Sequence, residues 1–145
     1  MKDFRVWGAV LLLAITGLAG AQERRYTQGA VMAVTSVKVM DGQMQNYMNF
    51  LDGTYKASME AAKKAGLILD YSVLKASPRG PNDADLYLVV KYPNMATLDG
   101  LDDKMEPIQS SVTKMNLMQR DEASGKRTVM RTLLGTELIR ELKLK

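Results

Sequence analysis

Apolar residues recur every three or four positions between residues 43 and 65, a spacing that places them on one face of an α-helix. This stripe consists of Met44, Tyr47, Met48, Leu51, Tyr55, Met59 and Ala62. Asp41 is placed to cap the start of the helix, and Gly66 is placed to end it, because glycine adopts the left-handed C-terminal conformation without strain. We interpret the Met and Tyr stripe as core packing rather than as a cofactor site.

Four apolar runs around this helix have the length and the alternation of β-strands. They cover residues 30–40, 67–77, 84–92 and 128–144. The turn residues of segment 78–83 predict a hairpin loop between the second and third runs. Gly135 interrupts the last run, where a glycine predicts a β-bulge or a bend.

A second helical region is expected between residues 94 and 125. Asn94 opens it, and Pro107 is expected in the first turn of a following helix, where a missing backbone N–H costs nothing. Gly125 is expected to end this region. The region therefore supplies one helix more than a simple alternation of elements would need.

The order of elements is strand, helix, strand, strand, helix, strand, with the extra helix before the last strand. This order predicts an α+β fold of the ferredoxin-like βαββαβ type, with a four-stranded antiparallel sheet and helices on one face. The other face would expose too much apolar surface to water. Its apolar members would include Met32, Val34, Val89, Leu133 and Ile139. A second copy packed about a two-fold axis would cover them in a barrel-like homodimer.

Residues 1–21 have the features of a secretory signal peptide. Lys2 and Arg5 precede an apolar run over residues 6–18, and cleavage is expected after the small residue Ala21. The run is too short for a membrane span, so no membrane association is expected after its removal. We expect a periplasmic or secreted protein with a disordered N-terminal segment, 22–29, and a single domain, 30–145.

Composition excludes several chemistries. The chain has no cysteine and no histidine, so it cannot assemble a zinc site of the ordinary type or use a histidine base. The acidic residues between Asp99 and Glu106 lack the ligand spacing of a calcium-binding EF-hand loop. We therefore predict no catalytic residues, no metal site and no cofactor.

The net charge of +4 is too small to indicate nucleic-acid binding. Basic residues do gather near the C-terminus, but Glu137 and Glu141 lie among them and no aromatic residues alternate with them. These basic residues are Lys126, Arg127, Arg131, Arg140, Lys143 and Lys145. We interpret them as a solvated edge of the sheet, with no nucleic-acid partner.

Segment 37–50 follows the pattern V-x-V-x-x-G-x-M-x-x-Y-x-x-F, and a helix ending in KKAGL, the hairpin loop and an arginine-containing last strand follow it. In this order of elements, residues 30–144 resemble the dimeric α/β-barrel superfamily, which includes antibiotic-biosynthesis-type monooxygenases and stress-responsive barrel proteins. The resemblance implies a homodimer, and an apolar or aromatic ligand held between sheet and helices. Haem-handling members use a histidine ligand, and oxygenating members often use Trp, His or Asn. This chain departs from both, because it has no histidine and its only tryptophan, Trp7, lies in the predicted signal peptide.

Polar side chains that strand alternation places away from the helices form the candidate ligand cavity. They are Ser36, Lys38, Asp70, Ser72, Asp85, Tyr87, Lys91, Arg131 and Glu137. Tyr87 and Arg131 would orient a small ligand there. The alternative is a dimer interface or a solvated face with cross-strand ion pairs.

Two functions fit these observations. The favoured one is a non-enzymatic exported barrel dimer that binds a small apolar or aromatic ligand, or a partner protein. The alternative is a cofactor-independent oxygenase or a related small-molecule enzyme, in which Tyr87, Asp70 and Arg131 polarise the substrate.

Overall fold

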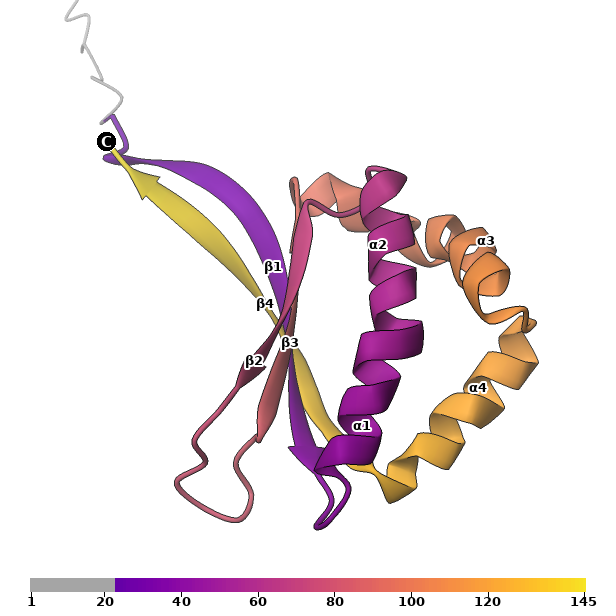
Figure 1. Cartoon of the computed structure of the whole chain (residues 1–145). Helices are drawn as coiled ribbons and strands as arrows, with labels where there is room; N and C mark the ends of the chain where they lie inside the picture. Colours follow the sequence, from indigo (N-terminus) through magenta and orange to yellow (C-terminus); the bar gives the residue numbers. More distant parts are fainter. Residues whose placement is uncertain (1–22) are drawn as a thin grey trace, which may run out of the picture.

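The structure, a computed structural model, describes residues 23–145, so the predicted signal peptide lies outside the described residues. Its elements are β1 (Tyr26–Val39), α1 (Met44–Phe50), the π-helical turn η1 (Leu51–Tyr55), α2 (Lys56–Lys64), β2 (Asp70–Lys75), β3 (Leu86–Tyr92), the 3-10 turn η2 (Met95–Leu98), α3 (Leu101–Thr113), α4 (Leu117–Lys126), the 3-10 turn η3 (Arg127–Val129) and β4 (Arg131–Leu144). The strands form one antiparallel sheet in the order β2-β3-β1-β4. The helices all lie on one face of this sheet (Figure 1). The predicted α+β class and four-stranded antiparallel sheet are therefore confirmed.

The helix predicted over residues 43–65 is present as α1, η1 and α2, which follow one another without a break. Its end has the predicted form. Gly66 has a φ of +75°, and the Leu67 N–H donates to the Ala62 carbonyl at 3.0 Å, as in a Schellman motif. Its start differs, because the chain enters the helix through Gln43 and no side chain caps it, Asp41 included.

The apolar stripe of this helix packs against the sheet, as predicted. Tyr47 is 1% exposed and lies in a cluster with Leu51 and with the inward residues of β1 and β3. Ala62 is fully buried in a second cluster, beside Tyr92 and Val31. Each large side chain buried in this way stabilises the fold by about 2 kcal/mol. These clusters fix the helices on one face and leave the other face uncovered.

The second helical region differs from expectation at both of its marker residues. Pro107 lies in the interior of α3 rather than in a first turn, because this helix begins earlier, after the left-handed Gly100. Gly125 lies inside α4 and does not end it. A further helix does precede the last strand, but it is α4, which starts at a capping box between Asn116 and Gln119 rather than near Pro107.

β4 contains the predicted bulge at Gly135, whose φ of +152° is rare for residues with side chains. The register between β4 and β1 shifts at this point. Before the bulge, Arg131 pairs with the buried Val39 on the helix-covered face. Beyond it, Glu137 pairs with Val34 on the open face. Alternation without a bulge had placed both Arg131 and Glu137 on the open face, so the prediction for Arg131 was wrong.

β1 begins at Tyr26, inside the segment that was expected to be disordered. The reason is that the end of β4 supplies backbone partners, with Tyr26 opposite Leu144 and Gln28 opposite Leu142. The two strands continue past the helices as a two-stranded arm (Figure 1). Both faces of this arm are free of helices.

Candidate functional site

The open face of the sheet gathers three of the predicted site residues. Ser36 on β1 lies directly opposite Tyr87 on β3, and Glu137 on β4 follows on the other side of β1. Together with hairpin residues 82–84 they line a hollow of about 390 Å³. The Ser36 and Tyr87 hydroxyls and the Glu137 carboxylate therefore line one hollow, together with Leu134.

Lys38 is held at one end of this face by an ion pair. Its Nζ lies 3.2 Å from the Asp85 carboxylate, whose other oxygen accepts the Val39 backbone N–H at 2.8 Å. Asp85 thus anchors the chain just before β3 to the end of β1. This arrangement is the cross-strand pairing considered as the structural alternative, and it leaves Lys38 already paired with a carboxylate.

The remaining predicted residues lie away from the hollow. Lys91 is at the opposite end of β3 from Tyr87, and it pairs across the strands with Asp70. The Asp70 carboxylate accepts a hydrogen bond from Lys63 of α2 at 2.9 Å, and this contact lowers the pKa of Asp70. Ser72 is exposed on the edge strand β2. The structure therefore does not unite all nine predicted cavity residues in one site.

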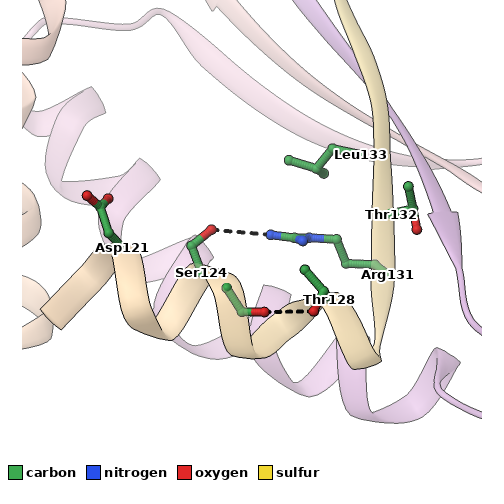
Figure 2. A pocket seen from close by; sticks show the side chains of 7 residues that line it. Asp121, Ser124, Thr128, Arg131, Thr132 and Leu133 are labelled. Atoms are coloured by element: carbon green, nitrogen blue, oxygen red, sulfur yellow. Dashed lines mark hydrogen bonds between the residues drawn. The ribbon is translucent and has the colours of Figure 1, made fainter. Parts of the chain in front are cut away.

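Arg131 lies on the helix-covered face and is only 7% exposed. Figure 2 shows its side chain reaching from β4 toward α4, where a guanidinium nitrogen donates to Ser124 Oγ at 3.5 Å. Burial raises the pKa of Tyr47, and the positive charge of Arg131 opposes that rise. Arg131 is therefore a buried cation beside the helical layer, separate from Tyr87 and Ser36.

A hollow of about 470 Å³ opens beside Arg131, between α4 and the start of β4 (Figure 2). Asp121, Ser124 and Thr128 line its helical side, and Thr132 and Leu133 line its strand side. Leu133 had been expected on the open face. It lies on the helix-covered face instead, because it precedes the bulge, as Arg131 does. About half of the Leu133 side chain is exposed in this hollow.

Two further residues have unusual surroundings that the sequence did not indicate. The Tyr55 hydroxyl and the Arg127 Nε are buried without a hydrogen-bond partner in the described part of the chain. Burial raises the pKa of Tyr55 to about 12, and burial together with nearby Arg131 lowers the pKa of Arg127. In the sequence, Tyr55 is one member of the apolar helical stripe and Arg127 is one of several basic residues near the C-terminus. Neither pattern indicates that these two residues are unusual.

Comparisons with protein-family models, with curated proteins and with solved structures gave no match for this chain. Among residues 23–145, no helix has the length and apolar character needed to cross a membrane. The same residues contain no group of three side chains placed to hold a metal ion. The candidate sites are therefore interpreted from their own geometry.

Proposed function

We propose that this chain is an exported small-molecule-binding protein that works as a homodimer of ferredoxin-like α/β subunits. The strand order, with the first and third strands in the centre, and the helices on one face support the ferredoxin-like arrangement. The signal-peptide features of residues 1–21 support export.

The observation that carries the proposal is the apolar character of the uncovered sheet face. Large side chains there remain accessible, with Leu74 50% and Ile139 40% exposed. Met32, Val34 and Val89 lie on the same face and are half-buried. Monomeric proteins rarely leave large apolar patches exposed to water. A second copy presents the same surface, so a two-fold axis pairs each apolar strand with another.

Packing of two such sheets would also close the hollow that Ser36, Tyr87 and Glu137 line. The Ser36 and Tyr87 hydroxyls would then orient a bound molecule, while apolar residues of both copies surround its body. The hollow itself is lined mainly by polar residues, so the apolar residues of the second copy would enclose a small apolar or aromatic ligand.

Light scattering coupled to size-exclusion chromatography tests the proposal at micromolar protein concentration. The expected mass is that of two chains. Native mass spectrometry of protein purified from its host, followed by solvent extraction, should reveal a small organic molecule. A monomer throughout the concentration range would contradict the dimer. A dimer that holds no small molecule, and takes up none from a panel of aromatic compounds, would contradict ligand binding at the interface.

A further inference from the structure

A third cavity lies within the helical layer, away from the open sheet face. Its volume is about 550 Å³, within the range of small-molecule sites. One wall comes from α1, η1 and α2, and the other from α3, α4 and the start of η3. Figure 1 shows these two sets of helices facing each other beside the sheet. The cavity is therefore formed within one chain.

Six of the fifteen residues that line the cavity are apolar. The apolar lining residues are Phe50, Met59, Val112, Met115, Leu117 and Ala123. Met side chains adapt their shape to a ligand at little cost, because they are unbranched and flexible. Such a wall accommodates an aliphatic or small aromatic body.

Two hydrogen-bond donors in this lining have no acceptor. Both Tyr55 and Arg127 line the cavity, and their unpaired atoms, the Tyr55 hydroxyl and the Arg127 Nε, are buried just behind its surface. The Arg127 guanidinium is stacked 4.3 Å from the centre of the Phe50 ring, which fixes its plane. Tyr55 ends the π-helical turn, an element often found at functional sites. A buried donor without an acceptor is costly, so an acceptor supplied by a ligand would stabilise this arrangement.

The charge balance specifies the acceptor. Within the described residues, neither Arg127 nor the adjacent buried Arg131 forms an ion pair, whereas Arg120 in the same lining is paired with Glu106. The helical layer thus holds two arginines whose charge no carboxylate contact neutralises. Asp121 is exposed and also lines the cavity, which disfavours a ligand of higher negative charge. One anionic group with a single charge fits best.

We propose that this cavity binds a monocarboxylic acid with an aliphatic or small aromatic body. The carboxylate accepts hydrogen bonds from Arg127 and Tyr55, and Arg131 supplies further positive charge nearby. The body lies along the apolar wall between Met59 and Met115. The site is complete in one subunit and does not depend on the dimer.

Methionine-methyl NMR locates the ligand directly, because methionines mark both candidate sites. Decanoate is the probe, and decanol, of equal chain length but without charge, is the control. Decanoate should shift the methyl signals of Met59 and Met115 in the cavity and leave Met32 on the open face unchanged. Shifts confined to Met32, or no shifts at all, would overturn the proposal.

Calorimetric titration then tests the anion contact. Decanoate should bind about tenfold or more tightly than decanol, and Arg127→Gln should remove that advantage, since a hydrogen bond to a charged group has about this value. Arg79→Gln, which removes an exposed arginine of the hairpin loop, is the matched control and should bind as the unmodified protein does. Arg127→Lys is a second variant in case Arg127→Gln disturbs folding. Because it keeps the charge, it should retain part of the preference for decanoate over decanol. Equal affinity for acid and alcohol would contradict the proposal.

Discussion

The open sheet face lacks cover for its apolar side chains, whereas the helical cavity lacks acceptors, among residues 23–145, for two buried hydrogen-bond donors. On the open face the charged side chain of Lys38 already has a partner, and the apolar residues lack cover. In the cavity the apolar residues lie between two sets of helices, and the polar atoms of Tyr55 and Arg127 lack partners in the described part of the chain. Covering an exposed apolar face requires a large complementary surface on another protein chain. A small molecule is enough to supply an acceptor to a buried hydrogen-bond donor.

Because of this difference, we assign dimerisation and carboxylic-acid binding to two separate regions of the molecule rather than to one site. Dimerisation should depend on the apolar residues of β1, β3 and β4, whereas decanoate affinity should depend on α2, α4 and η3. Substitutions on one side should therefore leave the other property unchanged. Substitutions more than about 7–10 Å apart usually act independently, which makes such a dissociation measurable.

The largest effect is expected from a charge on the open face. Ile139→Asp places a carboxylate in each half of the proposed interface, where it would be desolvated without a partner. The dissociation constant of the dimer should rise by about 100-fold or more. Light scattering over a dilution series measures it. Met118→Asp, at a 72% exposed position of α4, is the control and should remain dimeric. Equal masses for the two variants would show that the open face is not the interface.

A smaller effect is expected from filling the cavity. Ala123→Leu adds a branched side chain to the lining and should weaken decanoate binding by about tenfold, because the ligand body loses space. The mass of the dimer should not change. Ala57→Leu, on the exposed side of α2, is the matched control. Unchanged decanoate affinity in Ala123→Leu, measured by calorimetry, would place the ligand elsewhere.

The unpaired hydroxyl of Tyr55 should lower the stability of the ligand-free protein. Tyr55→Phe removes a buried donor without an acceptor, so the free energy of unfolding should rise by about 1 kcal/mol. Tyr71→Phe is the contrasting control, because the Tyr71 hydroxyl donates to Glu60 at 2.6 Å and its loss should not stabilise the protein. Urea unfolding at equal protein concentrations compares them. A loss of stability in Tyr55→Phe would mean that the hydroxyl has a partner.

The smallest effect concerns alkaline pH. Burial raises the pKa of Tyr55 from 10.0 to about 12, so the folded state holds this proton more tightly than the unfolded state does. The free energy of unfolding is therefore unaffected by ionisation of this group below pH 10 and falls as the pH rises from 10 toward 12. Tyr55→Phe should therefore lose less stability than the unmodified protein over that interval. Parallel urea unfolding curves at pH 9 and pH 11 compare the two proteins, and equal losses would contradict the expectation.

The order of elements could be predicted from the sequence because local spacing determines it. The apolar stripe around Tyr47 and Leu51 has helical spacing, and the runs around Val37 and Leu88 alternate as strands do. The left-handed Gly66 also follows from local chemistry. The start of β1 could not be predicted, because residues 26–29 form a strand only through pairing with the distant end of β4.

The candidate sites were less predictable because they depend on contacts between distant elements. A bulge at Gly135 was expected, but its effect on the facing of Arg131 appears only when the pairing with β1 is known. The environment of Tyr55 and Arg127 arises where two helical segments meet, and each residue fits an ordinary local pattern. Alternation correctly placed Ser36 opposite Tyr87, since no bulge intervenes between β1 and β3.

The separation of the two regions is tested most directly by the affinity of monomeric Ile139→Asp for decanoate. Calorimetric titration should be performed at a concentration where light scattering shows a monomer. Because the cavity lies within one chain, the monomer should bind decanoate with the affinity of the unmodified protein, one molecule per chain. Loss of decanoate binding in a folded monomer would contradict this account and place the ligand between two sheets.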